Sequence, residues 1–464
     1  MRTASAFTQP GATPSVESLP LPSGRRGLPF IGSFLSFMAD PLGGITAARN
    51  EGGRLSVHEF GPFTYVFMHD PQDVQHVFVR NHKNYVKSRS YKGLRLVMGN
   101  GLVTSEGEFW KRQRKLSQPA FHRQRLETLA TTMATAVDAL AGEWTAKTKH
   151  GPHQTDVFRE MMRLTLGIVG QTLFGIDLTD DANELGPAIT VALTRANKQA
   201  ESVFPVPLWI PTPLNVRFNR AKNLLDRVVH RIIAERRAHG RDEGDLLSML
   251  MAATDESGTE RMTDEQLRDE VMTLFLAGHE TIATAMSWTW WLLSRHPEVA
   301  QRVRDELDRE LGDRAITFAD LPKLTYTGWV IDECMRVRPP VWIVERTAIE
   351  NDVVGGHRIP KGTIIGASPW GLHHDPRLWD HPERFDPERF SPERSEGRHK
   401  YAYMPFGAGP RICIGNAFAL MESKIIMAGL MRRFSIEIDG PMPKPDPKVT
   451  MRPKHGMAGT IARR

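Results

Sequence analysis

The chain has 464 residues, of which 40% are hydrophobic and 25% are charged, proportions typical of a water-soluble globular protein. Its two cysteines exclude a disulfide framework and favour a reducing compartment such as the cytoplasm. No run of about 18 apolar residues occurs, so we expect no membrane span. The formal net charge of +6 favours an acidic partner, but the sequence has no long basic run, so we do not expect nucleic-acid binding.

The N-terminal residues are small and polar, and residues 1–18 are predicted to form a flexible segment. The remaining residues, 19–464, are predicted to form a single domain. The first stretch of this domain, Leu19–Gly32, is interrupted by prolines and glycines. We expect it to be an ordered arm on the surface.

The next segments predict a hairpin and a short helix. Leu55–Phe60 and Phe63–Met68 flank Gly61 and Pro62, a pattern typical of two strands joined by a tight turn. Pro71–Arg80 is predicted to be helical. Asn81–Val103 contains several glycines and is predicted to be an irregular cover over a site.

A helix is predicted at Glu106–Ala120, where Trp110 and Arg114 are four residues apart and so share one face. Taken alone, this pair is equally typical of a solvated basic helix. Basic residues cluster in or just after this helix, at Arg112, Lys115, Arg123 and Arg125. Further helical patterns cover Glu127–Thr145, Val157–Phe174, Leu185–Ser202 and a segment that ends at Arg237.

A proline-rich break, Phe204–Pro213, separates the last two of these helices. The helix pair either forms a lid that contacts oily ligands or is joined by a packed turn. The sequence favours neither alternative.

The longest predicted helix extends from Thr263 to His296. Thr263-Asp-Glu-Gln266 is a capping box that marks its start, and Pro297 ends it. A helix of this length spans about 50 Å, enough to cross the molecule.

The middle of this helix reads Ala277-Gly278-His279-Glu280-Thr281. A glycine inside a helix costs roughly 1 kcal/mol relative to alanine, so it requires a reason. The reason is either close packing against another helix or room for a small molecule. Thr281 lies one turn after Ala277, and its hydroxyl can donate to the carbonyl four residues earlier. His279 is interpreted as a packing histidine rather than a ligand.

Later segments supply further candidates. Glu333 and Arg336 are spaced as a helical ion pair, which on a surface contributes little. Val341–Gly366 is rich in β-branched residues and is predicted to form strands. Closing strands are predicted at Phe434–Ile438, Lys448–Met451 and Gly459–Ala462. The adjacent His373 and His374 could suggest a metal site, but we interpret them as structural.

The stretch Phe406–Gly415 places Cys413 after a loop with two glycines, Gly407 and Gly409, and before a predicted helix at Asn416–Arg433. The glycines permit a close backbone approach, and the following helix start favours a thiolate. Arg411 is expected to lie beside that thiolate. A lone cysteine is more often a small buried hydrophobe, and a phosphate loop would need a further glycine and a Gly-Lys-Ser/Thr sequence.

Taken as a whole, these ten residues resemble the haem-binding loop of the cytochrome P-450 monooxygenases, Phe-x-x-Gly-x-Arg-x-Cys-x-Gly. The residues that match are Phe406, Gly409, Arg411, Cys413 and Gly415. The segment Ala277–Thr281 resembles the oxygen-activation motif of the same family, and Glu333 with Arg336 resembles its Glu-x-x-Arg motif, whose later arginine partner matches Arg389. The resemblance implies a mainly α fold with small β-sheets and a long central helix over haem.

The resemblance also implies roles for individual residues. Cys413 is the expected iron ligand of haem b. The expected cofactor-binding residues are Trp110, Arg114, Ala277, Gly278, Arg346, Phe406 and Arg411. Glu280 and Thr281 are the expected catalytic pair that delivers protons to dioxygen.

The implied activity is that of a monooxygenase, which inserts one oxygen atom of O2 into a C–H bond. The electrons are expected from a separate ferredoxin or flavodoxin with its reductase, as in the soluble bacterial type. Trp342, Phe204 and Trp209 suggest a hydrophobic substrate, with fatty acids and terpenoids ahead of polar metabolites. The alternatives are a haem-thiolate peroxygenase or isomerase and a haem-binding protein without turnover.

Overall fold

The structure is a computed structural model that describes residues 16–25, 27, 32–178, 182–202, 206–239, 245–252 and 261–464. The α-helices are α1 (Phe34–Ala39), α2 (Pro41–Gly52), α3 (Pro71–Gln75), α4 (Tyr91–Met98), α5 (Gly107–Ser117), α6 (Arg123–Lys147), α7 (Val157–Phe174), α8 (Ala182–Glu201), α9 (Pro213–His239), α10 (Leu246–Ala252), α11 (Asp264–Arg295), α12 (Pro297–Leu311), α13 (Thr325–Val337), α14 (Pro369–His373), α15 (Pro392–Ser395) and α16 (Asn416–Met431). Shorter helical turns include η1 (Val16–Ser18), η2 (His76–Arg80), η3 (His82–Asn84), η4 (Gln118–Phe121), η5 (Phe318–Asp320), η6 (Pro387–Phe390), η7 (Lys400–Ala402) and η8 (Gly409–Arg411).

The strands are β1 (Gly24–Arg25), β2 (Leu55–Phe60), β3 (Phe63–Met68), β4 (Tyr85–Lys87), β5 (His153–Asp156), β6 (Val344–Ala348), β7 (Asp352–Val354), β8 (His357–Ile359), β9 (Ile364–Ala367), β10 (Phe434–Ile438), β11 (Pro445–Pro447), β12 (Met451–Pro453) and β13 (Ala458–Arg463). They form a six-stranded sheet in the order β1-β2-β3-β9-β6-β4, a three-stranded sheet β10-β13-β5 and two two-stranded ribbons.

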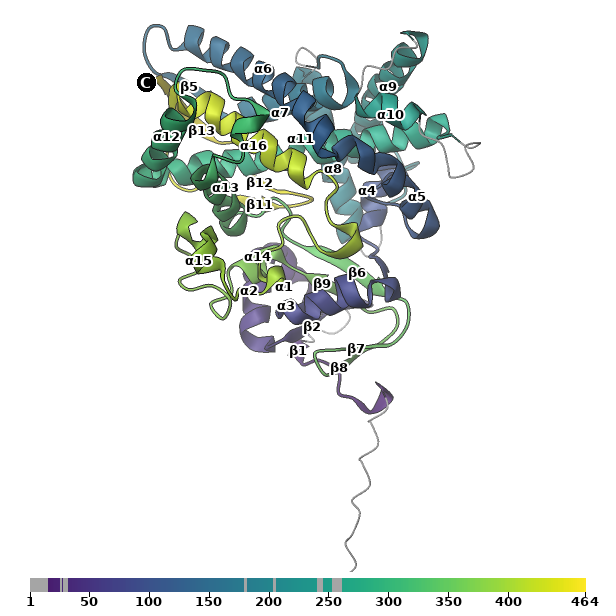
Figure 1. Ribbon diagram of the computed structural model, residues 1–464. Coiled ribbons are helices and arrows are strands. Elements are labelled where there is room, and N and C mark those ends of the chain that lie inside the picture. The colour runs from purple at the N-terminus through teal and green to yellow at the C-terminus, as the bar shows by residue number, and fades with distance from the viewer. Residues whose placement is uncertain are drawn as a thin grey trace, which may run out of the picture.

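The molecule has a helix-rich part and a part built around the six-stranded sheet (Figure 1). In Figure 1 the sheet lies below, with α1, α2 and α3 beside it, and most of the long helices lie above. The mainly α architecture with small sheets confirms the fold class predicted from the sequence.

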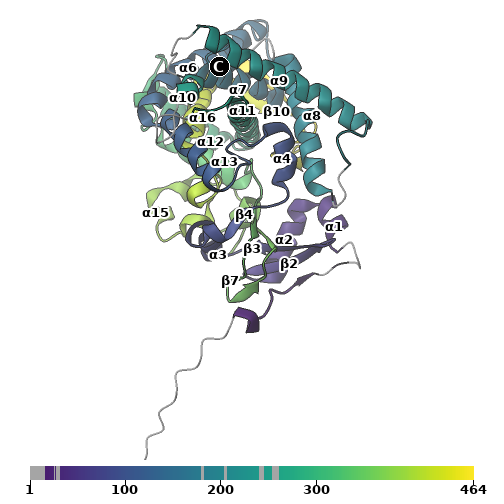
Figure 2. The same cartoon turned by 90° about the vertical axis from the view of Figure 1, so that its right-hand side faces the viewer.

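The long helix α11 runs through the inside of the helix-rich part, where Figure 2 shows it close to end-on among other helices. It packs against α7, α9, α13 and α16. Thr263 and Gln266 form the predicted capping box, in which each side chain bonds the other residue's backbone N–H. Trp288 and Trp290 near its C-terminal end are buried in the main hydrophobic core. This core therefore fixes the position of the motif in the middle of α11.

The predicted hairpin is confirmed, since β2 and β3 pair antiparallel from Leu55 with Met68 to Phe60 with Phe63. Gly61 has a φ of 60°, which a glycine adopts without strain. The parallel pairing of β3 with β9 then joins this hairpin to the later strands. That pairing brings β6, which contains Arg346, into the same sheet.

Some expectations differ from the structure. The predicted irregular segment 81–103 contains a two-turn helix, α4, because its apolar residues Leu94, Val97 and Met98 pack inward. The predicted strand Lys448–Met451 is wrong in its bounds, since β12 begins at Met451. Of the predicted flexible segment 1–18, residues 1–15 lie outside the described residues, and the remaining three form η1.

Candidate active site

The loop before α16 holds its shape through two left-handed glycines. Gly407 and Gly409 have φ values of 78° and 69°, which only glycine adopts readily. A Cβ on Gly409 would lie 1.9 Å from the carbonyl oxygen of Phe78, so no other side chain fits there. The N–H of Cys413 donates to the carbonyl of Phe406 over 2.9 Å, which closes the loop over its glycines.

The side chain of Cys413 is accessible, although it lies deep in the protein. Burial raises the pKa of its thiol, while the N–H of Gly415 and the charge of Arg114 act in the opposite direction. Arg114 also donates to the carbonyl of Ile412 over 2.8 Å. The expectation that Arg411 lies beside the sulfur was therefore wrong, because Arg114 takes that place.

Arg411 is held by residues at the start of α5. Its guanidinium group lies 4.1 Å from the ring centroid of Trp110 and donates to the carbonyl of Ser105 over 3.0 Å. It also forms an ion pair with Glu106. Trp110 and Arg114 thus share one helix face, as predicted, and that face contacts the cysteine loop.

Positive charge is concentrated next to this loop. Lys87 on β4 pairs with Arg346 on β6, and both lie near Arg411. Burial lowers the pKa of the Lys87 ammonium well below its usual range, and the charges of Arg346 and Arg411 lower it further. Glu106 is the carboxylate that acts against this effect. A ligand with carboxylate groups would offset the excess positive charge.

On α11, Thr281 has the geometry predicted from the sequence. Its hydroxyl donates to the carbonyl of Ala277 over 2.7 Å, inside the helix. Ala277 and Thr281 both line a cavity. Gly278 does not line the cavity, because it faces α7. A Cβ at this position would lie 3.1 Å from Cγ2 of Val169 on that helix. Close packing against α7 therefore explains this glycine.

The neighbouring carboxylate, Glu280, is buried and held by residues from the far end of the chain. Thr450 donates a hydrogen bond of 2.6 Å to its Oε1. The guanidinium group of Arg452 lies 3.9 Å from the same oxygen. Both partners belong to the segment around β12, which packs against α11. The site therefore fixes Glu280 by a hydroxyl group and a charge.

His279 points away from the cavity and is fully buried. Burial lowers the pKa of its imidazole to about 4, and its backbone carbonyl accepts the hydroxyl of Thr165 on α7. It packs between helices, as predicted. Among the described residues, its ring nitrogens make no hydrogen bond of normal geometry, although the backbone of Met162 lies close enough to act against the effect of burial on this pKa.

The cavity beside Thr281 has a volume of about 380 Å³. Its wall is mostly apolar, and its residues come mainly from α1, β2, β3, α4, α8, α11, β6 with the segment before it, and the segment before β12. The predicted cover contributes Tyr91, Leu94, Met98 and Val103. The α8 residues Leu193, Ala196 and Ala200 are consistent with the lid alternative.

The aromatic residues expected at the substrate fall into three cases. Trp342 lines the cavity and donates from its indole to the carbonyl of Lys448. Trp209 is 82% exposed and lies away from the described cavity wall, so that expectation was wrong. Phe204 lies outside the described residues.

The family model for cytochrome P450 matches residues 22–459. The chain belongs to the cytochrome P450 family. It is 34% identical to cyclooctatin synthase of Streptomyces melanosporofaciens, with 92% of each chain covered. It is 33% identical to cyclooctat-9-en-7-ol 5-monooxygenase of the same organism, with 88% of each chain covered.

The solved structures agree with this assignment. The retinoic acid-bound cyanobacterial protein CYP120A1 superposes with a TM-score of 0.85 at 26% identity, covering 96% of this chain and 100% of that one. Members of the family are haem-thiolate monooxygenases, and this cytochrome P450 binds haem and uses O2. Within the described residues, no helix is long and apolar enough to cross a membrane.

The residues of this P450 fit haem. An accessible thiol stands inside the protein, as a thiolate ligand requires. The cations near Arg411 carry the charge that two propionate groups would balance. Gly407 leaves open space where a side chain would project. Each of these features was anticipated by the sequence except Lys87, which has no motif of its own.

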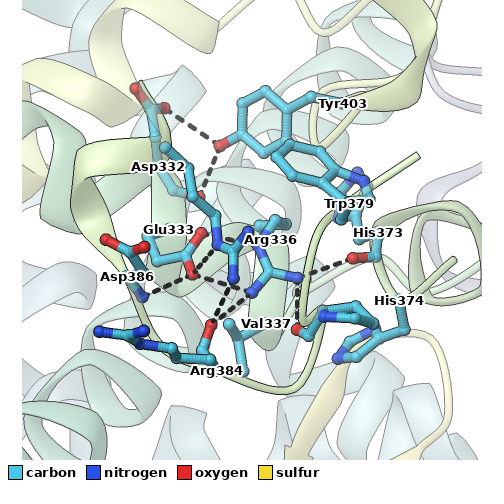
Figure 3. A network of polar contacts seen from close by, with 12 residues as sticks. Asp332, Glu333, Arg336, Val337, His373, His374, Trp379, Arg384, Asp386 and Tyr403 are labelled. Carbon is cyan, nitrogen blue, oxygen red and sulfur yellow. Dashed lines mark hydrogen bonds and ion pairs between the residues drawn. The ribbon is translucent and has the colours of Figure 1, made fainter. Parts of the chain in front are cut away.

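A buried charge network supports the loop of this P450 (Figure 3). Arg336 and Glu333 form two hydrogen bonds of 2.6 and 2.8 Å, and Nε of Arg389 lies 3.4 Å from the same carboxylate. Both side chains of the first pair are fully buried. The alternative of a surface ion pair is therefore wrong, and the predicted three-residue network is confirmed.

The network reaches the cysteine loop through His373. The carbonyl of His373 accepts a hydrogen bond of 2.7 Å from Arg336, as Figure 3 shows. Its Nε2 accepts the N–H of Met404 over 3.0 Å, just before the loop begins. Burial lowers the pKa of this imidazole to about 3, so it stays neutral. The structural interpretation of this histidine is therefore confirmed.

Sequence reasoning missed Thr450, Arg452 and Lys87. Their positions depend on the pairing of β4 with β6 and on the packing of the β12 segment against α11. No local pattern around these residues indicates a role. The only chemical signal was that Lys87 and Arg452 are basic.

Proposed function

We propose that this P450 inserts one oxygen atom from O2 into a C–H bond of a terpenoid, with a fatty acid as the second candidate. The observation that carries this proposal is the mostly apolar cavity of about 380 Å³ whose wall includes Ala277 and Thr281. Such a cavity suits a compact hydrocarbon framework. The relative named for cyclooctat-9-en-7-ol acts on an alcohol, and the structural neighbour contains bound retinoic acid.

In this proposal the cysteine loop and α5 hold the cofactor, and residues 19–464 form one catalytic domain. Cys413 is the iron ligand, and Phe406 lies at the start of its loop. Arg114, Arg346 and Arg411 balance the propionate groups, with Trp110 positioning Arg411. Haem, when bound, supplies the activation and reductive cleavage of dioxygen. Gly278 is assigned only an indirect, supporting role, because it packs against α7 and does not line the cavity.

Proton delivery is assigned to Glu280 and Thr281. The Thr281 hydroxyl donates to Ala277 within the helix, so its free lone pairs can accept a hydrogen bond from a water in the cavity. Glu280 lies next to it in sequence and is connected to the inside of the protein by Thr450 and Arg452. A positioned acid–alcohol pair of this kind typically contributes about 10²–10⁴-fold to a proton-transfer step.

The electrons are proposed to come from an acidic ferredoxin or flavodoxin with its reductase. The docking surface consists of Arg112, Lys115, Arg123 and Arg125. The last three are exposed, and Arg112 is half-buried. The helix α5 contacts the cysteine loop through Arg114. The ring centroid of Phe121 lies 6.4 Å from that of Phe418 at the start of α16. A donor bound here would sit close to the thiolate side of the cofactor.

We further propose that the protein works in the cytoplasm, because its free cysteines suit a reducing compartment.

The test is turnover of terpenoid probes with a bacterial ferredoxin, its reductase and NADPH under ¹⁸O2. The expected product is a terpenoid that carries one ¹⁸O atom and is formed only with the complete electron supply. Product formed from hydrogen peroxide alone would favour the peroxygenase alternative. An isomerised product without ¹⁸O would favour an isomerase. Haem binding without any product from the probes would favour a protein without turnover.

A further inference from the structure

Four charged residues line the cavity among its described wall residues: Arg89, Glu280, Glu345 and Lys448. The guanidinium group of Arg89 lies 3.9 Å from the ring centroid of Phe63 and donates to the carbonyl of Ser202. The ammonium group of Lys448 pairs with Asp446 over 2.8 Å. Glu280 is bound by Thr450, as described above. Three of the four charges are therefore occupied by protein partners.

The fourth, Glu345 on β6, has one carboxylate oxygen left open. The hydroxyls of Ser88 and Ser90 donate to it over 2.9 and 2.7 Å, and both bonds end on Oε2. No side chain or backbone group among the described residues donates to Oε1. Because Glu345 is part of the cavity wall and is not fully buried, Oε1 is left for a ligand.

The surroundings of Glu345 make this open oxygen a strong acceptor. Burial raises the pKa of its carboxyl group, while the serine hydroxyls and the charges of Arg89 and Arg346 lower it. Burial raises the pKa of the phenol of Tyr65, another wall residue, and the nearby Glu345 charge raises it further. A carboxylate removed from water in this way gains more from a hydrogen bond than one at the surface.

We propose that Glu345 determines substrate specificity by accepting a hydrogen bond from a hydroxyl group, so that the substrate is a terpenoid alcohol. This inference rests on the proposed monooxygenase function and deepens it. A hydrocarbon would leave Oε1 unpaired inside the cavity. A substrate carboxylate would place a second negative charge beside Glu345.

The location of Glu345 also orients the substrate. It lies on the β6 side of the cavity, whereas Ala277 and Thr281 lie on α11 in the same wall. A hydroxyl fixed at β6 leaves the hydrocarbon framework to extend toward α11. The oxidised carbon is then separated from the hydroxyl group, and the product is a diol.

The experiment measures dissociation constants of the haem-loaded protein for farnesol, farnesyl methyl ether and farnesoic acid from the change in haem absorption. Farnesol is expected to bind about tenfold more tightly than the ether, the effect of one hydrogen bond to a charged group. In Glu345→Gln this ratio should fall to about one, because the charge is removed at unchanged size. Haem content and the carbon monoxide spectrum should stay unchanged.

Glu59→Gln provides the matched control. Glu59 lies on β2 in the same sheet, accepts the Thr64 hydroxyl, and is outside the described cavity wall. This variant should keep the wild-type ratio. A comparison of the three probes in the wild type needs no variant, so the proposal can be tested even if Glu345→Gln does not fold.

Several outcomes would overturn the proposal. If farnesol and its methyl ether bind the wild type equally, or if Glu345→Gln keeps the tenfold ratio of their dissociation constants, Glu345 does not accept a hydrogen bond from the substrate hydroxyl. If farnesoic acid binds most tightly, the cavity selects an acid. In these cases the terpenoid monooxygenase still stands. If no probe binds, the terpenoid proposal is wrong, and this inference falls with it.

Discussion

The hydroxyl group of Thr450 donates a hydrogen bond of 2.6 Å to Oε1 of Glu280 across 170 residues of sequence. Both residues are buried. Thr450→Val keeps the shape of the side chain and removes this donor, which leaves a buried carboxylate oxygen with only Arg452 nearby. We expect a loss of about 1–3 kcal/mol in the free energy of unfolding and less product per NADPH consumed.

Denaturant unfolding and product-to-NADPH ratios check this prediction. Thr460→Val is the control, because Thr460 donates to the exposed carboxylate of Asp439. The prediction is contradicted if both variants lose the same small amount of stability and remain coupled.

Thr281→Ala removes the hydroxyl group that we propose positions water near the cofactor. Helix propensity is preserved and little volume is lost, so the fold should survive. Electron transfer should continue, because Cys413 and its loop are unchanged. The fraction of NADPH that yields product should fall and hydrogen peroxide should appear, as measured by a peroxide assay beside product analysis. Full coupling on a true substrate would exclude the proposed role.

The two cysteines should differ in their effect on the haem spectrum. The reduced carbon monoxide complex should absorb near 450 nm, as the family's thiolate ligation gives, and Cys413→His should lose this band while keeping some haem. Cys334 is fully surrounded by core residues, and burial raises the pKa of its thiol. Cys334→Ala should therefore keep the band. The opposite pattern would refute the ligand assignment.

Charge reversal at the basic surface beside the cysteine loop should slow reduction by an acidic donor. Lys115→Glu with Arg123→Glu should lower the rate of electron transfer, and salt should lower the wild-type rate because exposed charges are screened beyond about 10 Å at 0.1 M. Stopped-flow reduction under carbon monoxide measures both effects. Lys361→Glu, on the segment between β8 and β9, is the control. A rate that salt and charge reversal leave unchanged would rule out this docking surface.

Glu270 on α11 should give the protein a stability that depends on pH. Its Oε2 accepts the N–H of Leu102, which belongs to the cover of the cavity, and burial raises the pKa of its carboxyl group to about 7. Because the pKa of Glu270 is higher in the folded than in the unfolded protein, its protonated form stabilises the fold. This contribution to the free energy of unfolding is fully present below the unfolded pKa of 4.5 and is lost as the pH rises through about 7.

Melting temperatures at about pH 5 to 8 for wild type and Glu270→Gln test this. The wild-type value relative to the variant should fall as pH rises and level off above about pH 7. Each unit of pKa shift is worth up to about 1.4 kcal/mol. The exposed Glu265→Gln should show no such trend. Parallel pH curves for wild type and Glu270→Gln would contradict the prediction.

Local patterns in the sequence predicted a large part of the fold. The hairpin at Gly61 and the capping box at Thr263 depend on residues close in the chain, and both appear where expected. The glycines of the cysteine loop likewise act through their own backbone angles. The helix α4 was missed because its glycine-rich surroundings hid a short apolar face. Trp209 was placed wrongly because an apolar residue in a loop does not reveal which way it points.

The motifs therefore determined the family, the cofactor and the chemical type of the central residues, since a thiolate loop and an acid–alcohol pair are written in consecutive residues. Tertiary structure alone decided which groups surround them. Arg114 rather than Arg411 lies beside Cys413, Thr450 holds Glu280, and Ser88 and Ser90 bind one carboxylate oxygen of Glu345 in the cavity wall. These pairings join segments far apart in the chain, so they depend on how whole helices and strands pack, which no local pattern contains.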